Sequence, residues 1–203
     1  MPKRNILIIS QYFPPDISGG GTRAYNYAKA LHNKGYNVTV ITAYPHLHES
    51  VPKKYKFKFF TREKMDGINI VRVWIPSLLH TSTKNRSILH LTFIITCLIP
   101  LYSIKTNVIF ASEPNLFAII PAYFYSKLKN ADVIRVVDDI WPEALYERGY
   151  VKSRVLKKIL NKLAKFSYDY PKFILPLTEN GKKIIQKTYS IKEEKIVVLR
   201  HGV

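Results

Sequence analysis

Three consecutive glycines, Gly19, Gly20 and Gly21, stand directly before a helical pattern near the start of the chain. Residues without a Cβ let the backbone approach a bulky ligand, and the free N–H groups at the start of a helix favour phosphate. Thr22 follows and can cap the helix, and Arg23 can add a positive charge. The segment therefore predicts a phosphate-binding loop. A flexible turn that binds nothing is the alternative.

The residues around the glycines narrow the type of phosphate ligand. A nicotinamide or flavin site would read G-x-G-x-x-G and would place an acid just after the second strand. Here Pro14 and Pro15 open a long loop, and the first acid after the second strand is Glu49. The pattern G-x-x-x-x-G-K-[ST] does not occur. Dinucleotide binding is therefore disfavoured, and a P-loop is excluded.

Metal ligation has little support in the sequence. His46 and His48 are close enough in the chain to form a pair, but no third ligand stands at a suitable spacing. We therefore interpret them as ordinary loop histidines and expect no metal site.

The elements that must position these residues alternate between short β-branched runs and longer helical patterns. Such alternation, with right-handed crossovers, predicts an α/β fold with a doubly wound, mostly parallel, Rossmann-like sheet covered on both faces. A hairpin is expected around Asp66 and Gly67, and Gly35 is expected to end the first helix. The expected strands are residues 5–10, 37–42, two within 55–76, 107–112, 132–138, 172–178 and 195–200, and the expected helices are 22–34, 86–102, 116–129, 151–166 and 179–189.

Length and composition fit one globular domain of 203 residues. Cys97 is the only cysteine, so no disulfide can form within the chain, and a reducing, cytoplasmic location is expected. The first apolar run is too short for a secretion signal. The longer apolar run at residues 88–104 falls short of a membrane span. We expect it to form a buried or interface-lying helix, with a span or a peripheral anchor as alternatives.

The formal net charge of +18 favours an anionic partner such as nucleic acid, an anionic leaflet or a phosphorylated substrate. Solvated lysine-rich helix faces are an equally good explanation. The excess is concentrated in residues 151–166, which contain no acid. At helical spacing, one face of this segment is expected to pack on the core through Val155, Leu156, Ile159, Leu160, Leu163 and Phe166.

Several segments taken in order resemble a known family. They are YFPP at residues 12–15, the glycine loop, TRAYNYAKALHNKGYNVTVIT at residues 22–42 and DIWPEALYERGY at residues 139–150. Together they resemble the amino-terminal half of a GT-B glycosyltransferase of family four, and within it the bacterial O-antigen and capsule amino-sugar transferases. The ending VVLRHGV is similar to the segment that leads into the second domain of such enzymes, with His201 where Asn is usual.

The resemblance implies a retaining transferase that uses a nucleotide-diphosphate sugar and needs neither a metal nor another cofactor. It implies that the glycine loop, with Thr22 and Arg23, approaches the donor diphosphate. Backbone donors aimed at that leaving group would stabilise the charge that grows in the transition state. The family's E-x7-E carboxylate pair is absent from this chain. It belongs to a carboxy-terminal donor domain, without which this domain is expected to be inactive.

The resemblance also implies roles for residues near the later strand ends. Family members often carry His before the Asp that follows the fifth strand, whereas this chain has Asp138 followed by Asp139. We expect Asp139 and Asp138 to be catalytic, with helix capping as the alternative for Asp139 and core packing as the alternative for Trp141. The expected acceptor-binding residues are Trp141, Glu143, Glu113, Thr178 and Glu179, with helix capping as the alternative for the last three.

The function implied is sugar transfer to a glycan acceptor carried on a polyprenyl diphosphate, at the inner leaflet, in cell-surface polysaccharide synthesis. The basic surface suits an anionic membrane, and no nucleic-acid motif is present. Another GT-B enzyme, such as a nucleotide-sugar epimerase, is one alternative. A non-catalytic membrane- or nucleic-acid-binding module is the other.

Overall fold

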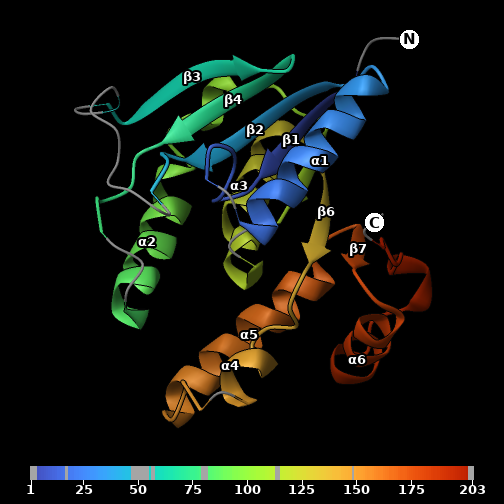
Figure 1. Cartoon of the computed structure of the whole chain (residues 1–203). Coiled ribbons are helices and arrows are strands. Elements are labelled where there is room, and N and C mark those ends of the chain that lie inside the picture. The colour runs from blue at the N-terminus through green and yellow to red at the C-terminus, as the bar shows by residue number, and fades with distance from the viewer. Residues whose placement is uncertain are drawn as a thin grey trace.

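The computed structural model describes residues 4–16, 18–46, 55, 58–78, 82–112, 115–147 and 149–200 (Figure 1). In chain order its elements are β1 (Asn5–Ile9), α1 (Gly19–Asn33), β2 (Asn37–Ala43), β3 (Phe60–Met65), β4 (Ile68–Val73), α2 (Thr83–Thr96), η2 (Leu101–Ser103), β5 (Val108–Ala111), η3 (Asn115–Ala118), α3 (Ile119–Lys129), β6 (Asp132–Val137), α4 (Glu143–Glu147), α5 (Arg154–Asp169), β7 (Phe173–Pro176), α6 (Glu179–Tyr189) and η4 (Glu193–Lys195).

The strands form one seven-stranded sheet in the order β3-β4-β2-β1-β5-β6-β7. All neighbouring pairs are parallel except β3 and β4, which pair antiparallel at one edge. The turn between them places Asp66 and Gly67 at φ 50° and 81°, as an Asp-Gly hairpin requires. The doubly wound, mostly parallel sheet expected from the alternating pattern is thereby confirmed.

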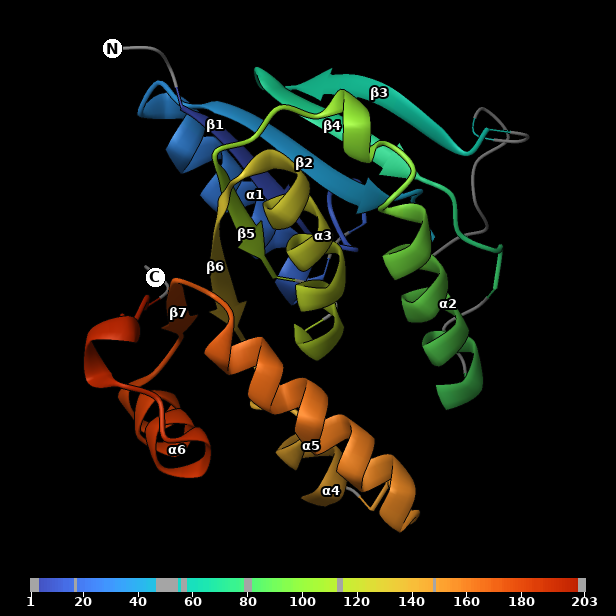
Figure 2. The ribbon, with the colours of Figure 1, turned by 180° about the vertical axis from the view of Figure 1, so that it is seen from behind.

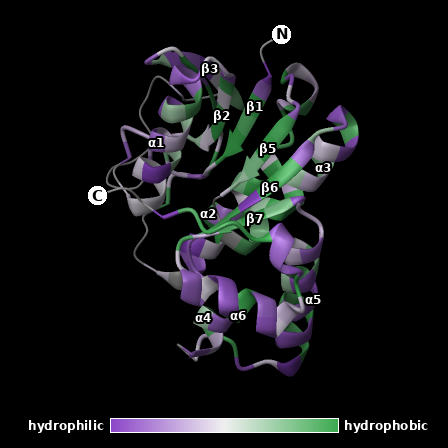
Figure 3. Ribbon diagram, turned by 90° about the vertical axis from the view of Figure 1, so that its right-hand side faces the viewer, coloured by the Kyte–Doolittle hydropathy of each residue, from purple (hydrophilic) through white to green (hydrophobic). Residues whose placement is uncertain are grey.

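The helices divide between the two faces of the sheet. The chain moves one way from β1 through α1 to β2, and the opposite way through α2, α3 and α5, so right-handed crossovers put these three helices on the face opposite α1. Figure 2 shows α2, α3 and α5 on the near side and α1 behind the sheet. The strands between the two layers are the most hydrophobic part of the ribbon in Figure 3.

Each face has its own core, as the strand alternation dictates. Ile6, Ile8, Val38 and Val40 pack toward α1 with Ala24 and Ala28, whereas Leu7, Ile9 and Ile41 pack toward α2 and α3. A third cluster joins α5, α6 and β7. The small alanines of α1 let that helix lie close to the sheet, which fixes its first turn above the end of β1.

The end of the first helix was predicted correctly from the sequence, whereas the last expected strand was not. Gly35, at φ 86°, follows the end of α1 and donates its N–H to the His32 carbonyl, as expected for a helix end. The strand expected at residues 195–200 is wrong. Ile196 makes one isolated bridge to Ile174, and Val197 and Leu199 donate to β7 carbonyls, so this segment lies along β7 without forming a ladder.

The expected packing of the basic helix is also wrong in part. The side chains of α5 that are buried in the core of the domain are Leu160, Ala164, Ser167 and Tyr168, and Leu163 is half-buried. The other apolar positions are exposed, namely Val155, Leu156, Ile159 and Phe166. Two apolar stripes therefore run along α5, and only one of them packs inward.

The apolar run at residues 88–104 is divided between α2 and the turns that follow it. Leu89, Phe93 and Cys97 are buried against the sheet, whereas Leu91 and Ile95 are exposed. Within the part of the chain that the structure describes, no helix combines the length and apolar character needed to cross a bilayer.

Candidate active site

The candidate site lies where the strand order reverses. The chain leaves β1 toward β2 and leaves β5 toward β6, so the carboxyl ends of the adjacent strands β1 and β5 form the switch point at which such sheets bind ligands. The first turn of α1 begins here, after the loop that follows β1. The glycines and Asp138 identified in the sequence both lie along this edge.

The glycines form the first turn of α1 and are not a loop. Ser18 caps the helix, since its hydroxyl accepts the Gly21 N–H at 2.9 Å. The prediction that Thr22 caps the helix is therefore wrong, and exposed Thr22 lies within the helix, its N–H bonded to the Ser18 carbonyl. A Cβ on Gly21 would lie only 3.0 Å from Ser18 Oγ and 3.1 Å from the Asp16 carbonyl. Glycine at position 21 thus lets the helix pack against the loop that leads into it.

The loop before α1 is fixed by a buried arginine from strand β4 of the same sheet. Arg72 of β4 is 1% exposed and donates from Nη2 to the Pro14 carbonyl at 2.5 Å. Its Nε donates to the Glu63 carboxylate on β3, and Nη1 reaches the Ala43 carbonyl at 3.5 Å. Thr42 adds a hydrogen bond from its hydroxyl to the Gln11 carbonyl at 3.0 Å. Side-chain hydrogen bonds therefore hold the backbone ahead of the glycine turn at Gln11 and Pro14.

A polar network that sequence reasoning missed lies beside this loop. His46 Nδ1 is 2.7 Å from the Tyr44 carbonyl, which can only accept, so that nitrogen carries a proton. His46 Nε2 lies 3.4 Å from the Gln11 amide nitrogen, and Gln11 Oε1 accepts from His90 Nδ1 at 2.6 Å. The His46 N–H donates to Asp16 at 3.0 Å. His46 is thus a buried part of the scaffold, and His48 lies outside the described residues.

Arg23 and Asp138, two of the residues selected from the sequence, form an ion pair in the part of the chain that the structure describes. Arg23 Nη1 lies 2.6 Å from Asp138 Oδ1, and their side chains are 17% and 8% exposed. The pair connects the second turn of α1 with the end of β6. Burial first, and then the nearby Asp138 carboxylate, raise the pKa of the Tyr27 phenol on the same helix.

The segment after β6 presents one exposed acid and one largely enclosed acid. Asp139 is exposed at a bend, and α4 begins only at Glu143. Glu143 Oε1 accepts from the Tyr189 hydroxyl of α6 at 2.7 Å, and burial and this carboxylate raise the pKa of Tyr189. The other Glu143 oxygen and Trp141 Nε1 are buried without a hydrogen-bond partner among the described residues. Trp141 packs on the α5–α6–β7 core, in agreement with the structural alternative for it.

A second buried arginine lies in strand β6, which leads into this segment. Arg135 of β6 is 1% exposed, donates to Ser167 of α5, and lies 4.1 Å from the centre of the Tyr168 ring. Burial lowers the pKa of Arg135, while the neighbouring Tyr168, Tyr189 and Glu143 oppose that shift. We therefore interpret these buried side chains around Arg135 as part of the structural core.

The remaining acceptor candidates occupy positions around β7 and β5. The Thr178 hydroxyl caps α6 by accepting the Gly181 N–H at 3.0 Å, so the capping alternative for Thr178 is realised. Glu179 is an exposed first-turn acid of α6 that lies 3.7 Å from Arg200. Glu113 lies outside the described residues. Among the described residues, no hydrogen bond or ion pair connects Thr178 or Glu179 with the glycine turn.

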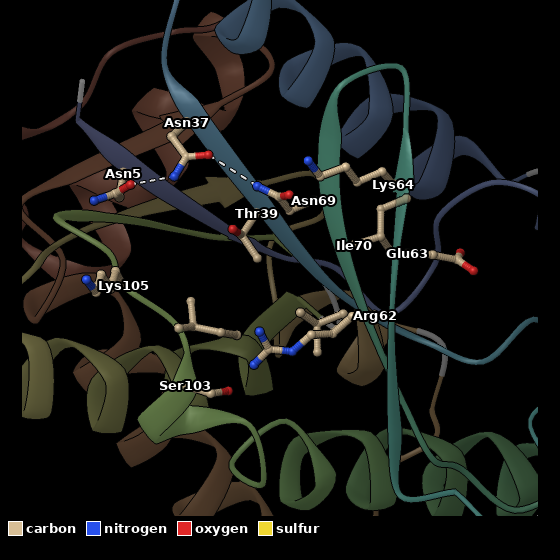
Figure 4. A pocket seen from close by; sticks show the side chains of 12 residues that line it. Asn5, Asn37, Thr39, Arg62, Glu63, Lys64, Asn69, Ile70, Ser103 and Lys105 are labelled. Atoms are coloured by element: carbon tan, nitrogen blue, oxygen red, sulfur yellow. Dashed lines mark hydrogen bonds between the residues drawn. The ribbon is translucent and has the colours of Figure 1, made fainter.

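A large cavity of about 520 Å³ lies at the other end of the sheet (Figure 4). Asn5, Asn37 and Asn69, near the amino-terminal ends of β1, β2 and β4, line it and form a ladder of side-chain amides, with hydrogen bonds of 2.6 and 3.2 Å. Ligands of doubly wound sheets bind at the carboxyl ends of the strands. The cavity is therefore separate from the candidate site.

The arrangement at the switch point is suited to binding an anion. It combines a glycine-containing helix start, an arginine in the next turn and a loop held by buried hydrogen bonds. Acidic side chains follow β6 close by. Among the described residues, no cluster of three or more His, Cys, Asp or Glu side chains could hold a metal ion.

Comparison with known proteins gives one family and several structures of the same fold. The sequence profile of Glycosyltransferase Family 4 matches residues 17–203. The search of curated proteins found no match. Among solved structures, sucrose-phosphate synthase from Thermosynechococcus elongatus has a TM-score of 0.68 at 11% identity, over 99% of this chain and 49% of the synthase.

Two further structures were solved with nucleotides. The catalytic domain of starch synthase IV from Arabidopsis thaliana, bound to ADP and acarbose, has a TM-score of 0.60 at 13% identity, over 99% of this chain and 52% of that one. HepE from Anabaena, in complex with UDP and glucose, has a TM-score of 0.54 at 10% identity, over 98% of this chain and 45% of that one. The chain thus spans about half the length of these proteins and has the fold of the amino-terminal half of the GT-B architecture.

Proposed function

The chain belongs to Glycosyltransferase Family 4, and on that premise we propose that it is the acceptor-binding half of a retaining transferase. The donor is a nucleotide-diphosphate sugar, and the acceptor is a lipid-linked glycan of the kind used in cell-surface polysaccharide synthesis. The nucleotides bound to starch synthase IV and to HepE support a donor of this class. Hexosyl or amino-sugar transfer is the chemistry proposed.

The observation that carries the proposal is the Arg23–Asp138 ion pair beside the first turn of α1. The N–H groups of that turn point along the helix axis toward the switch point and bring the positive end of the helix dipole with them. Arg23 lies one turn further on, where it can exchange Asp138 for a phosphate oxygen. The helix start and Arg23 would then stabilise the diphosphate as it leaves the sugar.

The proposed roles of the acids follow from their exposure. Asp139 is exposed shortly after the end of β6 and would contact the reacting sugar or the acceptor. Asp138 would keep the Arg23 side chain in position between turnovers through their ion pair. Glu143 and Trp141 are held by Tyr189 and the core, so they would shape the acceptor site from behind.

The proposal assigns the charge of the leaving diphosphate to protein groups and not to a metal ion. We therefore expect transfer to continue in the presence of EDTA. A donor-binding partner domain, which completes such an active site, would supply the contacts to the nucleotide. In a cytoplasmic enzyme of this kind, the lipid-linked acceptor would be reached at the inner face of the membrane.

Sugar transfer by the native gene product tests the proposal. A panel of radiolabelled UDP-, ADP- and GDP-sugars would be incubated with a lipid extract as acceptor. Arg23→Gln should lower kcat/KM at least about 100-fold, as expected for the loss of one donor to a developing anion. Arg62→Gln, at an exposed arginine on β3, is the matched control and should leave kcat/KM unchanged. Transfer that is insensitive to Arg23→Gln, or an inverted anomeric configuration in the product, would overturn the proposal.

A further inference from the structure

The three helices on the face opposite α1 expose an unusual amount of apolar side chain. Ile95 of α2 is 67% exposed, Val155 of α5 is 70% exposed, and Tyr102 of η2 is 81% exposed. We call the outer side of these helices the α2–α3–α5 surface. Its exposed apolar residues are Ile88, Leu91, Ile95, Ile99 and Tyr102, then Phe124 and Leu128 of α3, and Val155, Leu156, Ile159 and Phe166 of α5.

These residues are not needed to pack the helices on the sheet. Each helix already buries a separate apolar stripe, through Leu89 and Phe93 in α2, Tyr125 in α3, and Leu160 and Tyr168 in α5. The exposed residues Ile88, Leu91 and Ile95 of α2 recur at intervals of three and four positions, which keeps them on one side of that helix. A second apolar stripe on the solvent side of several neighbouring helices indicates a further interaction surface.

The charges on these helices have one sign. Asp169 is the only acid in α2, α3 and α5, and it lies 2.9 Å from Lys165 in an ion pair. The basic residues are Lys84 and Arg86 of α2, Lys127 and Lys129 of α3, and Arg154, Lys157, Lys158, Lys162 and Lys165 of α5. The surface therefore combines exposed apolar side chains with a strong excess of positive charge.

The surface is continuous from one helix to the next. Tyr123 of α3 packs edge-on against Phe166 of α5, with ring centres 5.6 Å apart. Lys129 of α3 donates to the Tyr102 carbonyl at 3.1 Å, which ties α3 to the end of the α2 region. Figure 2 shows α2 and α3 next to each other on the near face of the molecule, with α5 running obliquely below them. A flat partner could therefore contact all three at once.

We propose that the α2–α3–α5 surface docks the chain on an anionic lipid bilayer. Helices that lie in the membrane interface combine apolar side chains with flanking lysine and arginine in this way. Each basic residue near an anionic leaflet strengthens binding roughly fivefold. A second copy of this chain would bring the same positive charge and would be repelled. Nucleic acid would match the charge but would leave the apolar side chains in water.

Vesicle cosedimentation of the chain tests the surface without any need for transfer activity. Phosphatidylcholine vesicles would be compared with vesicles containing 30% phosphatidylglycerol (about 3 lipids in 10), in increasing NaCl. The chain should bind the anionic vesicles and be released by salt. Lys158→Glu with Lys162→Glu should weaken binding at least about tenfold at low salt. Leu91→Ser with Ile95→Ser should weaken it about tenfold or more at every salt concentration.

Matched variants elsewhere on the molecule provide the controls. Lys183→Glu with Lys187→Glu on α6 makes the same charge change at the same spacing, and Phe59→Ser removes a side chain that is 70% exposed beside β3. Both should bind vesicles nearly as the unchanged chain does, and thermal unfolding should show that all variants are folded.

Three results would overturn the inference. One is the absence of binding to anionic vesicles, and another is an equal loss of binding in the surface variants and the controls. The third is a concentration-dependent dimer, seen in analytical ultracentrifugation, that Leu91→Ser with Ile95→Ser abolishes. That result would assign the surface to self-association.

Discussion

The segment between β1 and α1 and the segment between β6 and α4 border the same candidate site but are held in different ways. In the first, side chains bond to the backbone, as Arg72 does to the Pro14 carbonyl and Thr42 does to the Gln11 carbonyl. In the second, the main contacts are between side chains, as in the pairs Arg23–Asp138 and Tyr189–Glu143. A backbone bond fixes the path of the chain, whereas a side-chain pair can be exchanged by a change of rotamer.

The difference suggests that the two segments have different roles in the proposed enzyme. The β1–α1 segment is built in advance and presents the glycine turn without rearrangement, which lowers the cost of binding an anion. The β6–α4 segment can change partners as the donor and acceptor arrive. Five substitutions test this comparison.

Replacement of Arg72 by methionine should have the largest effect on stability. It removes the donors to the Pro14 and Ala43 carbonyls and leaves Glu63 without its cation. The free energy of unfolding should fall by about 3 kcal/mol. Urea denaturation followed by circular dichroism would measure the change. Arg62→Met, at an exposed position on β3, should change stability by no more than about 0.5 kcal/mol, and equal losses in the two variants would contradict the assigned role of Arg72.

Two alanine substitutions in the glycine turn should have opposite effects. Gly21→Ala forces a Cβ against Ser18 Oγ and the Asp16 carbonyl, so the chain should lose about 2 kcal/mol of stability. Gly19→Ala places its Cβ in open space, 4.0 Å from the nearest Arg23 atom, and should stabilise the chain by about 0.5 kcal/mol. The same denaturation experiment measures both. Similar values for the two variants would show that the loop yields to the added methyl group.

Asp138→Asn tests whether the Arg23–Asp138 ion pair can be exchanged for a bound anion. The substitution should cost about 1.5 kcal/mol of stability, because a hydrogen bond between charged groups becomes a weaker one. It also removes a negative charge beside the proposed diphosphate position, so inorganic pyrophosphate should bind roughly fivefold more tightly. An NMR titration of the amide signals of α1 would measure the binding. Weaker binding by the variant would mean that Asp138 does not compete with the anion for Arg23.

Tyr189→Phe should have the smallest destabilising effect at neutral pH, about 1 kcal/mol, through the lost donor to Glu143. Burial and Glu143 raise the pKa of Tyr189, so the folded chain keeps this proton at a pH where the unfolded chain loses it. Stability from Tyr189 is thus complete below about pH 10 and declines above it. Thermal unfolding at neutral and alkaline pH should show a smaller alkaline loss in Tyr189→Phe than in the unchanged chain. Tyr102→Phe, at an exposed position, should behave as the unchanged chain.

Features of the fold with local causes could be predicted from the sequence. The Asp66–Gly67 turn and the end of α1 at Gly35 depend on backbone conformations that a few neighbouring residues decide. The start of α1 was placed three residues late, since Ser18 and Thr22 are both suitable caps and tertiary packing of Gly21 selects the first. The two apolar stripes of α5 have the same helical period, so periodicity alone cannot tell which one faces the sheet.

The candidate site could be predicted only in outline. Arg23 and Asp138 were each selected, but nothing in the sequence indicates that residues so far apart in the chain form a pair. The Gln11–His46–His90 network was missed for the same reason, because its partners come from three different elements. The one available signal was the position of Gln11 and His46 just after the first two strands.

The antiparallel edge strand β3 has a consequence for the behaviour of the chain at high concentration. Among the described strands β3 lies at the edge of the sheet, a position at which another molecule could add a strand. The exposed Arg62 and Lys64 lie along this edge, so an approaching copy would have to desolvate and confront like charges. Copies of the chain concentrated on a bilayer should therefore remain unassociated. The charges on β3 oppose the edge-to-edge strand pairing that starts fibrous aggregates.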